Sequence, residues 1–212
     1  MKNLKLPTLL FLVTFCTAVS AEDSDNQLWD AFLWKLAQTQ KTTISLYGEH
    51  RNSDDGHVAF GYFVGPVVRH KVSAGFTLGA AVKQIYLKTN PGFREWQRTE
   101  LEATYKLSLG PATFDHRNRH EYFFRDAGAD FQRYRSRLRL HMPVAGGRIK
   151  GLAMSNEFFY DERTRAFEIN RFVPASITYK LGGKITIDTY YMWEHRRTGS
   201  VENHIVGNTL YF

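Results

Sequence analysis

From Thr42 to the C-terminus, clusters of glycine, proline, asparagine and aspartate separate longer stretches, and in several of these stretches apolar and polar residues alternate with a period of two. A period of two is typical of a β-strand whose two faces meet different surroundings, and the clusters contain the residues that form tight turns. No helical period runs through this region. The pattern predicts strands at about residues 42–51, 57–65, 72–87, 94–107, 113–124, 131–142, 149–160, 167–181, 185–197 and 203–212.

The stretch 131–142 carries an arginine at every second position, so that four guanidinium groups share one face of the predicted strand. They belong to Arg133, Arg135, Arg137 and Arg139. A soluble sandwich turns its apolar face inward, whereas a membrane barrel has lipid outside and polar side chains inside. The alternation alone fits both architectures.

Three further features favour a membrane barrel. The predicted strands are long enough to cross a bilayer when they are tilted. The connections include a tight turn at Gly182–Gly183 and charged segments such as 161–165, as expected of periplasmic turns and surface loops. The chain ends on a strand with Phe212, and this resembles the C-terminal aromatic signal of outer-membrane barrels. We therefore expect an all-β, antiparallel up-and-down transmembrane barrel, porin-like in build, over residues 42–212. A soluble periplasmic barrel that binds a small ligand is the alternative.

If both ends of the barrel chain lie on the periplasmic side, the number of strands must be even. Ten strands satisfy this condition, and twelve are the alternative. Residues 22–41 are expected to form an N-terminal periplasmic segment. Within it, apolar residues of the stretch 28–38 fall at helical spacing, which indicates a short amphipathic helix at the barrel rim, although residues 28–36 could also form an extra strand.

The first 21 residues have the features of an export signal. Lys2 and Lys5 precede an apolar stretch, and small residues at Val19 and Ala21 predict cleavage after Ala21. Cys16, the single cysteine of the sequence, lies inside this signal, so the mature chain has no disulfide framework. No run of eighteen apolar residues follows the signal. Export and a barrel together predict the outer membrane of a Gram-negative bacterium.

The formal net charge is +7, which nucleic acid, anionic lipid or internal acids could balance. Nucleic acid fits an exported chain least, so we expect no nucleic-acid partner. The expected partners are outer-membrane lipids, lipopolysaccharide and, during insertion, the barrel assembly machinery. The histidines show no metal-ligand spacing, and no glycine-rich phosphate loop occurs. We accordingly expect no metal site and no cofactor.

Several short segments in the second half of the chain resemble an uncharacterised outer-membrane barrel family, catalogued as domain of unknown function 2490. The segments are 117–121, 134–138, 156–161 with 170–172, and 188–192 with 204–210. The resemblance implies a barrel in the outer membrane and implies no reaction.

On the inward face, a polar network is predicted around the arginine strand. If the 113–124 and 131–142 strands join through a loop centred near residue 128, Glu121 faces Arg135, while the remaining pairs are arginine against arginine. Such like-charged pairs need acids from the neighbouring strands. The predicted set is Glu100, Glu102, Arg117, Arg119, Glu121, Arg133, Arg135, Arg137, Arg139 and Glu157, with Arg119 opposite Arg137 and Arg117 opposite Arg139. It either fills the barrel or makes an anion-binding or anion-conducting lumen.

The outward face offers a second hypothesis. The same register would place His120 opposite Ser136, with Asn118 two residues away on the same face. A histidine can deprotonate a serine, and a polar neighbour can orient the ring, so this trio predicts a lipid-modifying hydrolase. A polar patch near lipid headgroups is the simpler interpretation. We expect a structural or transport-related role before an enzymatic one.

Overall fold

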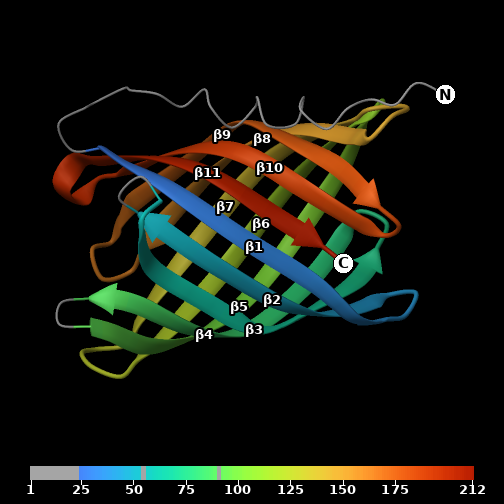
Figure 1. Ribbon diagram of the computed structural model, residues 1–212. Helices are drawn as coiled ribbons and strands as arrows, with labels where there is room; N and C mark the ends of the chain where they lie inside the picture. The colour runs from blue at the N-terminus through green and yellow to red at the C-terminus, as the bar shows by residue number, and fades with distance from the viewer. Residues whose placement is uncertain (1–23, 54–55, 90–91) are drawn as a thin grey trace.

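The computed structural model describes residues 24–53, 56–89 and 92–212, and its strands close into a single barrel (Figure 1). The strands are β1 (Ser24–Gln38), β2 (Thr42–Ser53), β3 (Val58–Ser73), β4 (Phe76–Thr89), β5 (Gly92–Leu109), β6 (Ala112–Arg125), β7 (Phe131–Pro143), β8 (Ile149–Asp161), β9 (Ala166–Gly182), β10 (Ile185–Arg196) and β11 (Val201–Tyr211). A short 3-10 helix, Thr198–Ser200, joins the last two. Among the described residues, no helix has the length and hydropathy needed to cross a membrane. The expected all-β barrel is confirmed.

The barrel has eleven strands, one more than the expected ten, and the additional strand is β1. β1 pairs in parallel with β11, from Ser24 opposite Glu202 to Leu33 opposite Tyr211, and the other neighbouring strands pair antiparallel. The expectation of an even number was wrong, because it assumed that both ends of the chain lie at one end of the barrel. In Figure 1 the arrows of β1 and β11 point the same way.

We use two names for the ends of the barrel. The N-terminal end is where β1 begins and where the connections β2–β3, β4–β5, β6–β7, β8–β9 and β10–β11 lie; the C-terminal end is where β11 finishes. The barrel wall thus starts at Ser24 rather than Thr42, and the segment 22–41, expected to be periplasmic, contains the whole of β1. The predicted signal, residues 1–21, lies outside the described residues.

The sequence of β1 fits both a helix and a strand, and the reason is geometric. Leu28, Phe32 and Leu36 are spaced by four, and a spacing of four falls on one face of a helix and of a strand alike. In the barrel these residues face outward, while Gln27 and Trp29 are buried inside. The buried residues are therefore two positions apart, as expected for a strand.

Two prolines lie within strands. β3 was expected to end at Gly65, but it continues through Pro66, and neither residue pairs with β4 before pairing resumes at Val67 opposite Ala81. A side chain at position 65 would collide with the backbone of Val82, so glycine permits the close approach of the two strands. At Pro174, the register of β9 shifts against both of its neighbours, as expected for a proline inside a strand.

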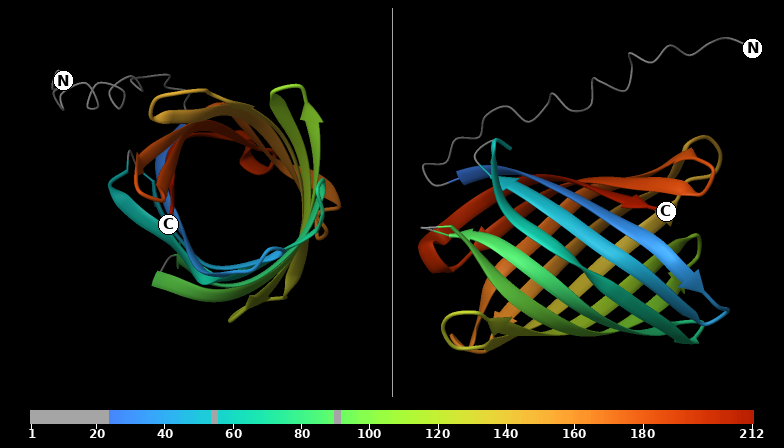
Figure 2. Two further views of the ribbon diagram at one scale, coloured as in Figure 1. Left: turned by 90° about the vertical axis from the view of Figure 1, so that its right-hand side faces the viewer. Right: turned by 60° about the horizontal axis from the view of Figure 1, so that its bottom comes forward.

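The two faces of the wall are chemically opposite. Large apolar side chains such as Val68, Leu101 and Leu138 are exposed on the outside, whereas charged side chains such as Arg98 and Glu121 are buried inside. Viewed along its axis, the wall forms a closed ring (Figure 2). The fold therefore creates one enclosed interior, and that interior holds the charged residues.

Candidate functional site

The barrel encloses a cavity of about 590 Å³ in which cationic side chains outnumber acidic ones. The cations are Arg51, Arg69, Lys83, Arg98, Lys106, Arg117, Arg119, Arg135, Arg137, Arg139 and Arg171. The acids are Glu49, Glu100, Glu102, Glu157 and Asp188. Because β-strands alternate their side chains, the charged positions of neighbouring strands meet in this one space.

The arginine strand β7 is paired with β6 in a register two residues away from the expected one. Glu121 lies opposite Arg133, not Arg135. The like-charged pairs are consequently Arg119 opposite Arg135 and Arg117 opposite Arg137, where we expected Arg119 opposite Arg137 and Arg117 opposite Arg139. The pairing of β6 with β7 is centred on residue 127, one residue before the middle of the connection 126–130, and a one-residue shift of this centre moves every pair by two.

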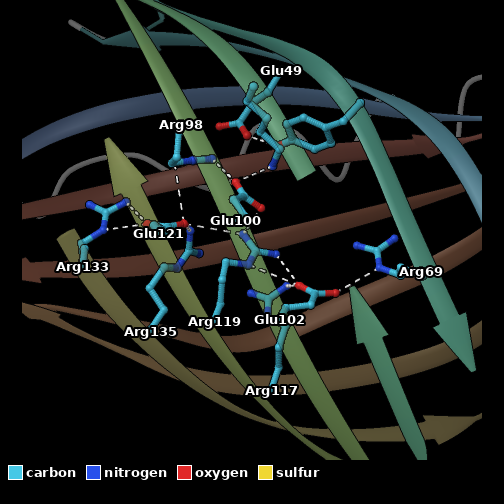
Figure 3. Close-up of polar contacts among 12 residues, drawn as sticks. Glu49, Arg69, Arg98, Glu100, Glu102, Arg117, Arg119, Glu121, Arg133 and Arg135 are labelled. Atoms are coloured by element: carbon cyan, nitrogen blue, oxygen red, sulfur yellow. Dashed lines mark hydrogen bonds and ion pairs between the residues drawn. The ribbon is translucent and has the colours of Figure 1, made fainter. Parts of the chain in front are cut away.

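Glu121 is the hub of the network and is fully buried. Its carboxylate accepts short ion-pair contacts from Arg133, at 2.6 Å, and from Arg135, at 2.7 Å. Arg98 and Arg119 approach the same carboxylate at 3.7 Å each. Figure 3 shows these guanidinium groups converging on it from β5, β6 and β7. One acid thus holds arginines of three strands.

Two further carboxylates separate the like-charged pairs. Glu157 lies 2.8 Å from both Arg135 and Arg117. Glu102 contacts Arg119 at 2.8 Å, Arg117 at 3.9 Å and Arg69 at 3.1 Å. These contacts satisfy the requirement that acids from neighbouring strands reach opposed arginines.

Glu100 completes this part of the network. Its carboxylate lies 2.6 Å from Arg98, 2.9 Å from Lys83 and 3.1 Å from Arg119. Lys83 and Arg98 were not predicted as members. Arg98 lies two positions before Glu100 on β5, so the two side chains face the same side of the strand, and this spacing could have identified Arg98.

Arg137 and Arg139 are held more loosely. Arg137 contacts Asp115 at 3.2 Å, and Arg139 lies 3.7 Å from Asp188. Both acids were missed in the sequence. A separate buried pair joins Arg171 to Glu194 at 2.6 Å. The bulge at Pro174 interrupts the alternation of β9, so the sequence did not show which side of the strand Arg171 faces.

Toward the N-terminal end, aromatic rings and guanidinium groups form what we call the aromatic–arginine ring, which shares Arg98 and Arg133 with the network. Its members in cyclic order are Trp29, Arg51, Phe63, Arg98, Phe123, Arg133, Phe159 and Arg171. Each guanidinium lies over the two rings beside it, at distances from 3.7 Å for Arg51 over Trp29 to 5.7 Å for Arg98 over Phe63. The order closes on itself because Arg171 lies over both Phe159 and Trp29.

The aromatic–arginine ring marks one limit of the cavity. Its four aromatic side chains are at most 5 % exposed, and Phe159 is at 0 %. Phe123 also stacks on Phe131, with ring centroids 4.3 Å apart. At the other limit, Lys106 and Tyr211 line the cavity close to the ends of their strands. The cavity therefore reaches toward the C-terminal end and is closed by packed rings on the other side.

The outward trio is not assembled as expected. Ser136 lies opposite Asn118, and His120 lies opposite Tyr134, because of the two-residue change in register. His120 instead lies 3.8 Å from the carboxylate of Glu162. Within the part of the chain that the structure describes, no three histidine, cysteine or acidic side chains are placed to hold a metal ion.

Comparison with known proteins places the chain in a family without giving it an activity. The sequence model of the family described as "Protein of unknown function (DUF2490)" matches residues 26–204. No curated protein matches the sequence. A solved structure, an anion-selective porin from Comamonas acidovorans, aligns with a TM-score of 0.40 and 11 % identity over 78 % of this chain. The chain spans 55 % of the length of that porin.

Proposed function

Since the chain belongs to the family of unknown function DUF2490, we propose a function from the barrel itself. The protein is an outer-membrane β-barrel with a transport-related role, which binds small anions in its interior. The aromatic–arginine ring closes that interior toward one side of the membrane. The excess of cations over acids in the lining of the cavity carries this proposal.

The outer wall supports a place in the membrane. Its exposed apolar side chains match a surface that faces hydrocarbon, and its buried charges match the polar inside of a membrane barrel. The chain would be exported by its signal, cleaved after Ala21, and inserted by the barrel assembly machinery. Lipids and lipopolysaccharide would then surround the wall. Outer-membrane barrels have short turns on the periplasmic side and longer loops outside. The β9–β10 turn at Gly183 is tight and lies at the C-terminal end, so we place this end in the periplasm.

This orientation makes a labelling prediction. Arg197→Cys and Ser24→Cys lie at the N-terminal end, and Lys184→Cys lies at the C-terminal end. On intact cells, a membrane-impermeant maleimide should label the first two and not the third. The expected mature chain has no competing cysteine. Labelling of Lys184→Cys together with Ser24→Cys, but not Arg197→Cys, would contradict the parallel closure of β1 on β11.

The chemistry of the lining favours anions with several oxygens. A guanidinium group presents a rigid fork of donors that matches carboxylate and phosphate. Arg137 and Arg139 have the longer contacts of the network, and Lys106 makes no ion pair within the described residues. Asp115 lies between Lys106 and Arg139 in the register of β5, β6 and β7. These cations could turn toward an anion without breaking the Glu121 hub.

Calorimetric titration of the folded protein with inorganic phosphate tests the proposal. The wild type should bind, and Arg137→Gln/Arg139→Gln should weaken the affinity at least about tenfold, because each charged hydrogen bond contributes about 1.5–3 kcal/mol. The control is Arg163→Gln, which removes a guanidinium paired with Asp161 outside the cavity. An absence of binding, or equal affinities for the wild type and the double variant, would refute the anion site.

A soluble ligand-binding barrel is the alternative that the sequence left open. A soluble protein would have to keep its wall of exposed leucine, valine and phenylalanine side chains in water, which favours association. The membrane protein should need detergent and should migrate differently on a gel before and after heating. Solubility without detergent would favour the alternative.

A further inference from the structure

On β6 and β7 the outer wall carries a cluster of polar side chains that the anion proposal does not use. Arg117, Arg119 and Arg135 line the cavity, so the alternate residues of β6 and β7 face outward. These include His116, Asn118, Tyr134 and Ser136, midway along the two strands. Polar groups that face hydrocarbon are costly and usually functional. Two hydrogen-bonded pairs that lie side by side on this face, His116 with Ser136 and Tyr134 with Asn118, therefore call for an explanation.

The first bond of the cluster joins a nucleophile to a base. Ser136 Oγ and His116 Nε2 are 2.9 Å apart. With the imidazole proton on Nδ1, Nε2 accepts the hydrogen bond of the serine hydroxyl. This is the geometry in which an imidazole removes the proton as the oxygen attacks a carbonyl carbon. Both side chains are half-buried, so the hydroxyl remains within reach of a molecule on the wall.

The second bond of the cluster orients a donor. The hydroxyl of Tyr134 donates to Asn118 Oδ1. Since Asn118 lies directly opposite Ser136, its amide stands beside the serine on the same face. With Oδ1 held by tyrosine, the N–H groups of Nδ2 are the atoms that the amide can offer to a developing oxyanion.

We propose that Ser136, His116 and Asn118 form a catalytic site for the hydrolysis of acyl esters of membrane lipids. Ser136 Oγ forms a bond to the ester carbonyl carbon while its proton passes to His116 Nε2, and Asn118 Nδ2 donates to the oxyanion. Collapse breaks the bond to the alcohol oxygen, which takes the proton from His116. Water then attacks the acyl-serine, gives its proton to His116, and the fatty acid leaves as Ser136 recovers the proton.

The surroundings of Ser136 select long acyl chains. Phe158 lies directly opposite it on β8, and Leu138, two residues along β7, is exposed on the same face. Leu101 of β5, opposite His120, is also exposed. An acyl chain would lie along this apolar wall while its ester meets the polar cluster. Short-chain esters lack that contact.

The test uses the full-length protein folded in detergent micelles, with a fluorophosphonate probe and p-nitrophenyl laurate. The wild type should be labelled at Ser136, identified by peptide mass, and should hydrolyse the laurate ester. Ser136→Ala should lose labelling, and His116→Gln should lose at least about 100-fold in hydrolysis. His120→Gln is the matched control, because it changes an outward histidine of the same strand that contacts Glu162 instead.

A purely structural role for the cluster makes a different prediction. In that case His116→Gln, which keeps a polar side chain, would leave every rate unchanged. Gel mobility before and after heating verifies that each variant is folded. Folded wild type without labelling and without laurate hydrolysis would overturn the proposal, as would equal rates for His116→Gln and wild type. Equal hydrolysis of p-nitrophenyl acetate would overturn the assignment to lipids.

Discussion

Glu121→Gln should lower the free energy of unfolding of the barrel by about 3–5 kcal/mol, because it removes the charge that holds four arginines. Removing one partner of a buried ion pair leaves the others uncompensated in a medium that solvates charge poorly. Here Arg133 and Arg135 lose their closest carboxylate oxygens, at 2.6 and 2.7 Å. Glutamine preserves the size of the side chain, so the effect reports charge and not a cavity.

The measurement is urea-induced unfolding in detergent micelles, followed by tryptophan fluorescence. Glu95→Gln is the matched control, because this glutamate is exposed on β5 and its loss should cost less than about 1 kcal/mol. If both variants lose the same small amount, Glu121 is not the hub that its burial and contacts indicate. The network would then contribute by filling space and not by charge.

Opening the aromatic–arginine ring should turn a closed barrel into a conducting one. The wild type should show no steady current in a planar bilayer, because the four aromatic side chains of the ring are almost fully buried and we expect them to block the interior at the limit of the cavity. Phe159→Ala removes a ring on which three guanidinium groups lie, and Phe123→Ala removes a ring on which two lie. Each should produce discrete current steps and should cost about 3–5 kcal/mol in stability.

The alternation of the strands supplies matched controls. Phe158 and Phe124 are the neighbours of these residues in sequence and face outward. Their replacement by alanine removes the same ring from the opposite face of the wall, so the barrel should stay closed. Current through the folded wild type equal to that through Phe159→Ala would show that the ring is not a barrier.

The sequence predicted the barrel well because alternation is a property of each strand on its own. The alternate arginines at positions 133 to 139 predict the inward face of their strand from its own sequence, without information about the neighbouring strands. Strand ends were harder to predict. Gly65–Pro66 has the composition of a turn, yet β3 runs through it because β4 approaches too closely for a side chain at position 65.

Contacts between strands depend on register, which the sequence fixes less firmly. Parity identified ten members of the ionic network but missed others such as Lys83, Arg98 and Asp115, and the pairing required the centre of the β6–β7 register to within one residue. That error separated Ser136 from its true partner, His116, which shares the outward parity of Asn118. The parallel closure depends on a contact between the two ends of the chain, and local pattern carries no information about it.

The two halves of the interior have different physical roles. The Glu121 network satisfies arginines that would otherwise be buried without partners, and it shares Arg98 and Arg133 with the aromatic–arginine ring. The cations nearer the C-terminal end, around Arg137 and Arg139, have weaker partners and line the accessible part of the cavity. An anion would meet these cations first, and the ring would stop it.

The ion selectivity of the Phe159→Ala barrel tests the central claim most directly, because current must then pass the cationic cavity. With a potassium chloride gradient across the bilayer, the reversal potential should have the sign of chloride permeation. Adding Arg137→Glu and Arg139→Glu should move it toward potassium. A potassium-selective current through Phe159→Ala, or one that the two added glutamates leave unchanged, would contradict an interior that accepts anions.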